Sequence, residues 1–273
     1  MSEARKTGTR EITVRRFSAE GGLCQRADHV AVEEPLEIQV GFHRGERRTL
    51  SITMRTPGHD EELAAGFLFT EGLLRHPSQV AAILAGRNSV RVELRPDVEI
   101  RWPDLERHVY TSSSCGICGK TSLDAVRSAQ ACPLPDDGAT VSAAVLTTLP
   151  GRLRGAQRAF DSTGGLHAAG LFTLSGELLD VREDVGRHNA LDKLVGARFL
   201  AGELPLADRM VMLSGRASFE LVQKALLAGV PILAAVGAPS SLAVDLAHDA
   251  GMTLAGFVRE GSFNLYSGSS RLR

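Results

Sequence analysis

Apolar and polar residues alternate along several short segments in the first third of the chain. The segments are Glu11–Phe17, Leu36–Val40, Leu50–Met54 and Ser89–Leu94. A period of two is typical of strands that bury one face. The first three segments predict a small antiparallel sheet. Ser89–Leu94, Val98–Trp102 and His108–Tyr110 would complete the mixed sheet of a smaller N-terminal domain.

Two helices are expected to interrupt these strands. Asp60–Glu62 place three acidic residues where the start of a helix favours negative charge, and apolar residues that would face inward follow them. We also predict a short helix over Ser78–Leu84, ended by Gly86.

The second half of the chain alternates between amphipathic helical segments and short apolar strands. Helices are predicted at Val141–Gln157, Arg187–Leu200, Ala217–Ala228 and Ser241–Ala250, the last capped by Ser240 or Ser241. Strands are predicted at Ala168–Leu174, Leu178–Arg182, Met210–Leu213, Pro231–Val236 and Thr253–Val258, the first two as a hairpin. Fully apolar strands between helices indicate a sheet covered on both faces, and hence an α/β fold with an α+β N-terminal part.

A segment rich in proline, glycine and acidic residues separates the two halves. Cys132–Gly138 holds two prolines, two aspartates and a glycine, a composition typical of linkers. We therefore predict one domain over residues 1–137 and a second over residues 138–273.

Composition excludes several classes of function. The chain has 31 basic and 32 acidic residues, a formal net charge of −1, so nonspecific binding to nucleic acid or to a membrane surface is not expected. No apolar run approaches the ~20 residues of a membrane helix, and no apolar leader begins the chain. We expect a cytoplasmic protein, in which the four scattered cysteines form no disulfide framework.

Candidate chemistry is concentrated in a cysteine motif near the middle of the chain. Cys115 and Cys118 are each followed by glycine, after a run of serines. Lys120 and the start of a predicted helix, Leu123–Ala131, would favour thiolate over thiol in this loop, and the thiolate is the reactive form.

Three functions fit a pair of cysteines two residues apart. A structural zinc site needs about four ligands, and Cys24 and Cys132 form no second pair. A thioredoxin-like redox pair normally follows a first βαβ unit, whereas more than a hundred residues precede Cys115. The third function is sulfur transfer, in which one thiolate carries sulfane sulfur as a persulfide.

The motif and its surroundings resemble the FdhD family, the formate dehydrogenase accessory sulfurtransferases. The matching blocks are Ser113–Lys120, Met54–Phe67, Thr163–Gly170, Arg182–Lys193 and Ser214–Glu220. The resemblance runs from about Glu33 to the C-terminus, and it implies a homodimer. It also implies transfer of sulfur from a cysteine desulfurase to the bis-molybdopterin guanine dinucleotide cofactor of formate dehydrogenase.

The resemblance also assigns residues. Cys115 would carry the persulfide and Cys118 would be the second thiol. Cofactor contacts would come from the residues just past the last predicted strand, namely Phe257, Val258, Arg259, Glu260, Gly261 and Ser262. Family members often carry further basic residues here, so the acidic Glu260 leaves more of the phosphate contact to Arg259. GDP would be a partial mimic of the cofactor, and no tightly bound metal is expected.

The order of elements in the second half also resembles the cytidine-deaminase-like fold. Zinc deaminases place H-x-E and P-C-x-x-C at two helix starts. Here those positions read Gly186–Asn189 and Ser214–Ser218, without a cysteine, so we do not expect a hydrolytic deaminase.

Four residues at predicted helix starts suit a large anion with two pyrophosphates. Ser214 and Arg216 follow the apolar strand Met210–Leu213, and Arg187 and His188 begin the predicted helix before that strand. Helix starts and guanidinium groups both bind phosphate. The alternatives are structural ion pairs for the arginines and a local backbone contact for His188.

Neighbouring residues have alternative roles. Asp192 could orient a ligand amine or His188, Thr163–His167 is a pocket loop or a tight turn, and Asp161 and Asp184 could be helix caps. Two functions of other classes also remain open. One is a noncatalytic chaperone for the guanylated cofactor, and the other is a thiol-disulfide oxidoreductase.

Overall fold

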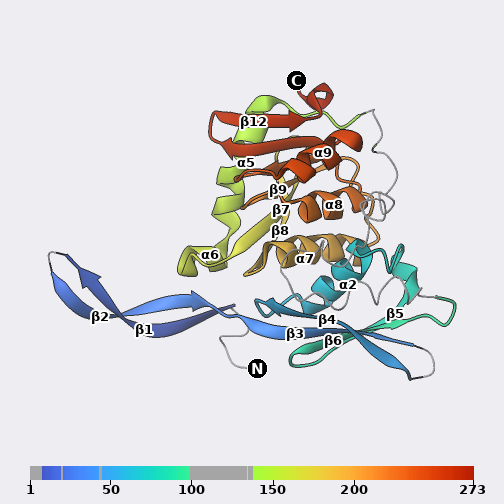
Figure 1. The fold of residues 1–273 in the computed structure, drawn as a ribbon, viewed down its shortest axis with the longest axis horizontal. Coiled ribbons are helices and arrows are strands. Elements are labelled where there is room, and N and C mark those ends of the chain that lie inside the picture. Colours follow the sequence, from blue (N-terminus) through green and yellow to red (C-terminus); the bar gives the residue numbers. More distant parts are fainter. Residues whose placement is uncertain (1–7, 20, 43–44, 99–133, 135–137) are drawn as a thin grey trace.

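The fold was analysed in a computed structural model that describes residues 8–19, 21–42, 45–98, 134 and 138–273 (Figure 1). Cys115, Cys118, the predicted helix Leu123–Ala131 and the strand His108–Tyr110 lie outside these residues, and the segment Val98–Trp102 does so apart from Val98. The predicted boundary between residues 137 and 138 falls at the end of the same undescribed stretch, so the division into two domains stays a prediction.

The strands in the described part of the chain form three sheets. A two-stranded sheet pairs β1 (Thr9–Ser18) with β2 (Gly22–Ala31). A four-stranded sheet has the order β4 (Arg47–Arg55), β3 (Glu34–Gly41), β6 (Ser89–Leu94), β5 (Val80–Ala85). A six-stranded sheet has the order β12 (Ser262–Ser267), β11 (Thr253–Arg259), β10 (Ile232–Ala235), β9 (Arg209–Leu213), β7 (His167–Thr173), β8 (Leu178–Asp184).

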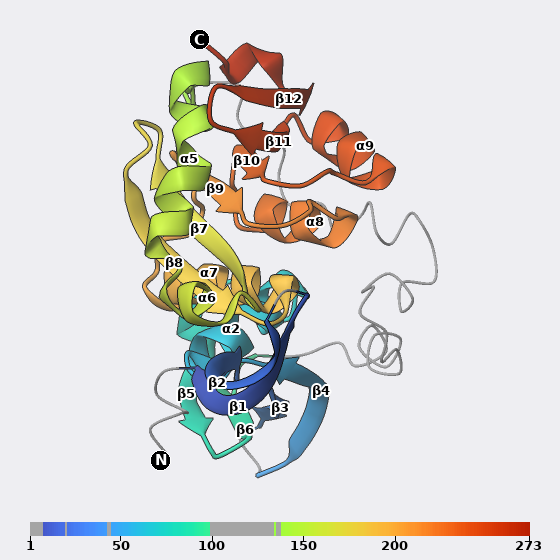
Figure 2. The ribbon, with the colours of Figure 1, turned by 90° about the vertical axis from the view of Figure 1, so that its left-hand side faces the viewer.

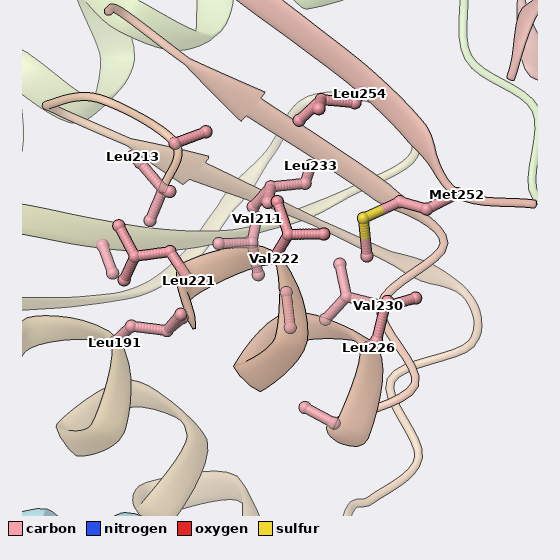
Figure 3. Close-up of a cluster of buried hydrophobic side chains, with 14 of the residues drawn as sticks. Leu191, Val211, Leu213, Leu221, Val222, Leu226, Val230, Leu233, Met252 and Leu254 are labelled. Atoms are coloured by element: carbon pink, nitrogen blue, oxygen red, sulfur yellow. The ribbon is translucent and has the colours of Figure 1, made fainter. Parts of the chain in front are cut away.

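Helices cover both faces of the six-stranded sheet, which confirms the predicted α/β class. Helix α5 (Ala143–Ala156) lies on one face, and α8 (Phe219–Leu227) and α9 (Ser241–Asp249) lie on the other (Figure 2). Successive residues of a strand point to opposite faces, so alternate side chains belong to the hydrophobic core on one face or to that on the other. Met212 packs with α5, whereas Val211 and Leu213 pack with α8 and with α7 (Arg187–Leu200) (Figure 3).

Most predicted elements of the second half are confirmed within one or two residues. Helix α7 has the predicted bounds, and the hydroxyl of Ser240 accepts a hydrogen bond from the Ala243 amide and so caps α9. The pattern missed α6 (Arg158–Thr163) and β12, because both are too short for a clear period. The chain ends with a single 3-10 turn, Ser269–Arg271.

The four-stranded sheet is mixed, as predicted for the N-terminal part, because β3 pairs with β4 antiparallel and with β6 in parallel. Two details differ from the prediction. β1 is not part of this sheet and pairs with β2, a strand that the pattern missed. The predicted helix Ser78–Leu84 is wrong. It is a 3-10 turn, Pro77–Gln79, followed by β5, because Val80–Ala85 pairs along the free edge of β6 and that pairing outweighs helix propensity.

The β1–β2 hairpin forms an arm that extends from the body (Figure 1). At its tip Phe17 and Leu23 lie opposite each other, 74% and 61% exposed. The base of the arm contacts α6. An isolated two-stranded hairpin is only marginally stable in water, so this base contact matters for the order of the arm.

Helix α2 (Asp60–Thr70) joins the two halves of the chain. One side packs on the four-stranded sheet through Leu63 and Leu68, and another side crosses α7. A Cβ added to Gly66 would lie 1.9 Å from the carbonyl oxygen of Asp192, and one on Gly196 would lie 1.9 Å from that of Glu62. The two backbones therefore touch, which glycine alone permits. No helix among the described residues is long and apolar enough to cross a membrane.

Candidate functional site

The candidate site is one edge of the six-stranded sheet. β8, β9, β10 and β11 end at this edge and β7 begins there, because β7 runs antiparallel to β8 and β9 while β10 is parallel to β9 and β11. At this edge Ser214 and Arg216 follow β9, and Arg187 and His188 begin α7. Phe257–Ser262 span the end of β11, the hairpin turn and the first residue of β12. The fold thus brings to one edge all the cofactor-binding residues predicted in the second half, the position where open α/β sheets commonly bind ligands.

The turn after β9 is fixed by hydrogen bonds on two sides. The amide of Ser214 donates to the Ala168 carbonyl (3.0 Å), and the Ala168 amide donates to the Ser214 hydroxyl (2.8 Å). On the other side the Gly237 amide donates to the Gly215 carbonyl (2.9 Å). Ser214 therefore positions the turn, and its neighbour Arg216 is held at the sheet edge.

Arg187 and Arg216 have no carboxylate partner in the described part of the chain. Neither forms an ion pair within 4.0 Å with a described residue, whereas Arg182 pairs with Glu62 and Arg198 with Asp180. The Nε of Arg187 is buried, and no described residue hydrogen bonds to it. The alternative of structural ion pairs is therefore not observed among these residues, and both guanidinium groups are available to an anion.

His188 lies at the start of α7 and contacts α8. Its Nε2 is 3.3 Å from the hydroxyl of Ser218 and 3.3 Å from a carboxylate oxygen of Glu220. Burial and the nearby charges of Arg187 and Lys224 lower its pKa to about 3. Serine and carboxylate approach the same ring nitrogen, whereas a catalytic triad needs them on opposite nitrogens, so this group is not a triad.

His167, which the sequence analysis named only as part of a loop, belongs to the same cluster. It is the first residue of β7 and is half-buried. A Cβ on Gly215 would lie 3.1 Å from its Nδ1. Burial and the charges of Arg187 and Arg216 lower the pKa of His167, so these three side chains interact electrostatically. A glycine-rich loop before a strand was the signal that could have identified it.

The aspartates near this edge have structural roles. Asp192 is buried and accepts hydrogen bonds from Lys224 (2.9 Å) and Thr70 (2.8 Å), so the expectation that it orients His188 or a ligand is wrong. Asp184 is completely buried and lies 2.7 Å from the ammonium of Lys193.

Asp184 does not cap α7. Its Oδ1 accepts from the amide of Gly186, the residue before α7 (2.8 Å), and no side-chain cap hydrogen bond is present at the described start of this helix. Asp161 lies in the first turn of α6 and pairs with Arg154 on the surface.

The hairpin between β11 and β12 carries the remaining predicted cofactor residues. A surface hollow of about 360 Å³ is lined by Phe257, Arg259, Ser262, Phe263 and Asn264. Phe257 has a positive φ of 51°, and its amide donates to the Gly237 carbonyl (3.2 Å), which places the hollow beside the Arg216 turn. Glu260 and Gly261 are exposed in the hairpin turn, whereas the side chain of Val258 is buried in the core and cannot line the hollow.

Two predictions concern residues outside this edge. Cys115 and Cys118 lie outside the described residues, so their roles stay predictions. Among the residues that are described, no three His, Cys, Asp or Glu side chains are grouped to hold a metal. Cys24, a cysteine outside the Cys115–Cys118 pair, is exposed on β2.

Comparison with known proteins identifies the family. The FdhD/NarQ family model matches residues 31–273. The sulfur carrier proteins FdhD of Streptomyces coelicolor and Streptomyces avermitilis are 53% and 52% identical to this chain over 264 residues, covering 93% of it and 92% of each relative. A crystal structure of a candidate formate dehydrogenase accessory protein from Desulfotalea psychrophila has a TM-score of 0.75 and 25% identity, covering 97% of this chain and 99% of its own. These matches extend over nearly the whole sequence, and the chain therefore belongs to the FdhD/NarQ family.

Proposed function

We propose that this protein is a cytoplasmic sulfurtransferase that relays persulfide sulfur from a cysteine desulfurase to the bis-molybdopterin guanine dinucleotide cofactor of formate dehydrogenase. The name sulfur carrier protein, borne by relatives about half identical to this chain, supports the transfer of sulfur. Binding of the cofactor is supported by one observation: Arg187 and Arg216, at the edge where β8, β9, β10 and β11 end, form no ion pair with a carboxylate of the described residues.

The residues at this edge fit the acceptor substrate. Donors that match pyrophosphate oxygens are the two guanidinium groups, the amides at the start of α7 and the exposed Ser262 hydroxyl of the hairpin. The hollow beside Phe257 and Arg259 offers room for a ring next to the charges. These residues would bind and orient the guanylated part of the substrate.

The first chemical step needs only thiol chemistry. The Cys115 thiolate attacks the terminal sulfur of the persulfide on the desulfurase. A new S–S bond forms at Cys115 as the donor's S–S bond breaks, and the desulfurase cysteine leaves as a thiolate. The exchange consumes no oxidant or reductant, and Cys118 supplies a second thiol that can help release the sulfur.

Mass spectrometry after incubation with a desulfurase and cysteine tests the proposal. Cys115 should gain the mass of one sulfur atom, Cys115→Ala should abolish transfer, and Cys118→Ala should weaken it. Cys24→Ala, which removes an exposed cysteine on the arm, is the matched control and should transfer sulfur normally. An unmodified Cys115, or full transfer by Cys115→Ala, would refute the proposal that Cys115 transfers sulfur.

The same experiment separates the other functions. A noncatalytic chaperone would bind the guanylated ligand without acquiring sulfur. A thiol-disulfide oxidoreductase would form a reversible Cys115–Cys118 disulfide. As partners we propose a cysteine desulfurase, formate dehydrogenase and a second copy of this chain, and light scattering at micromolar concentration would report the dimer.

A further inference from the structure

His167 is held in a defined position at the sheet edge. It opens β7, where its backbone pairs with Asp184 of β8, and the next residue, Ala168, exchanges two hydrogen bonds with Ser214. Gly215 then passes so close that a side chain there would meet the imidazole at 3.1 Å. The ring therefore has a fixed neighbour on the side of the β9 turn.

The charged groups that interact with His167 come from three neighbouring parts of the fold. Arg187 and His188 come from α7, Arg216 comes from the β9 turn, and Asp184 comes from the end of β8. Asp184 attracts a proton to the ring, but its carboxylate is already paired with Lys193 at 2.7 Å. The two guanidinium groups and burial act in the opposite direction and lower the pKa of His167.

Within the described ranges, no residue hydrogen bonds to the His167 ring, and neither Arg187 nor Arg216 forms an ion pair with a carboxylate. A ligand that brings two negative charges between these arginines would offset the repulsion that, together with burial, lowers the pKa of His167. It would also give the imidazole an acceptor. The ring nitrogens would then become donors, as they are in the protonated form.

We propose that His167 is a third anion-binding residue of this edge and takes up one proton from solvent when a pyrophosphate group binds between Arg187 and Arg216. This inference rests on the proposed function, because it concerns the same ligand site. Imidazole and a proton give imidazolium, so charge and atoms balance without another reactant. Protonation would make the site most cationic when the anion is present.

The probe is GDP-mannose, a guanosine pyrophosphate whose phosphates are all esterified and do not titrate near neutral pH. Calorimetry in two buffers of different ionisation enthalpy should show uptake of about one proton near pH 6. The affinity should rise as the pH falls from 8 to 5.5, by at most about tenfold per pH unit. The imidazole signals of His167 should titrate at higher pH in the complex than in the free protein.

His167→Asn should bind the probe with an affinity that hardly changes over this pH range. His248→Asn is the matched control, because His248 is an exposed histidine at the end of α9, and it should keep the wild-type pH dependence. If His167→Asn does not fold, proton uptake and the imidazole titration of the wild-type protein still test whether His167 takes up a proton on binding.

Two further outcomes would overturn the inference, and they differ. Wild-type binding that is independent of pH, without proton uptake, would refute the role of His167 and leave the proposed function standing. If GDP-mannose does not bind at any pH, the proposal that this edge binds the guanylated cofactor is refuted, and this inference with it.

Discussion

The ammonium group of Lys224 lies 2.9 Å from Oδ2 of Asp192, and both side chains are almost completely buried. Thr70 of α2 donates to the same carboxylate and accepts from Lys224, each at 2.8 Å. Burial opposes the charge on Lys224, but Asp192 and Glu71 outweigh it and raise its pKa. The pair therefore ties three helices, α2, α7 and α8, at one point.

Removing one partner of the Lys224–Asp192 pair should destabilise the protein. Lys224→Met leaves a buried carboxylate without its countercharge, and we expect the free energy of unfolding to fall by about 3–5 kcal/mol. Urea denaturation measures the loss. The double variant Lys224→Met/Asp192→Leu should lose less than Lys224→Met alone, because it leaves no uncompensated charge. Additive losses would show that the two groups do not interact.

The crossing of α2 and α7 depends on glycine. Gly66→Ala would place a methyl group 1.9 Å from the Asp192 carbonyl oxygen, so the helices must separate. We expect a loss of about 3 kcal/mol or more, or a failure to fold, because overpacking here forces backbone movement. Thermal unfolding monitored by circular dichroism provides the measurement.

Gly151→Ala is the control for this substitution. Gly151 is an exposed helical residue of α5 with no atom within 4 Å of an added Cβ. The same change should stabilise the protein there by about 0.4–1 kcal/mol, because alanine restricts the unfolded chain. Equal effects at Gly66 and Gly151 would contradict the close contact between the helices.

His188 should make stability depend on pH below neutrality. Its pKa is lowered from 6.5 to about 3 in the folded protein by burial and by Arg187. Between these pH values the unfolded chain binds a proton that the folded protein does not. Stability from this group is therefore complete above pH 6.5 and is lost as the pH falls toward 3, by about 1.4 kcal/mol per pH unit at most.

Two measurements check this dependence. The His188 imidazole should remain neutral at pH 5 by NMR, and urea denaturation between pH 7 and 4 should show the falling stability. In His188→Asn the slope should become shallower. A His188 signal that titrates near 6.5 would contradict the burial and charge argument.

Arg216 should contribute directly to binding of a guanosine diphosphate. A charge-assisted hydrogen bond contributes about 1.5–3 kcal/mol, so Arg216→Ala should weaken the affinity for GDP by roughly 10-fold to 100-fold. Isothermal titration calorimetry measures it.

The control is Arg209→Ala, which removes the same charge from the opposite end of β9. Arg209 contacts Asp208 on the surface, far along the strand from the turn that holds Arg216. This variant should bind GDP like the wild-type protein. Similar losses in both variants would mean that net charge, and not a contact at the sheet edge, governs binding.

The local sequence pattern was sufficient to predict most helices and strands of the second half. The bounds of α7, the β7–β8 hairpin and the cap at Ser240 follow from periodicity, turn residues and capping chemistry that act over a few residues. The placement of Ser214, Arg216, Arg187 and His188 after strands or at helix starts was also readable, because parallel strands end at a common edge. The α/β class follows from the same signals.

Tertiary structure decided what depends on neighbours distant in sequence. Val80–Ala85 became a strand because β6 offered a free edge, and the buried partners of Asp192 and Asp184 came from α8 and α7. His167 joined the arginines only when β7, α7 and the β9 turn met. Sequence determines which segments have helix or strand periodicity, whereas pairing, burial and charge environment are properties of groups that only the folded chain brings into contact.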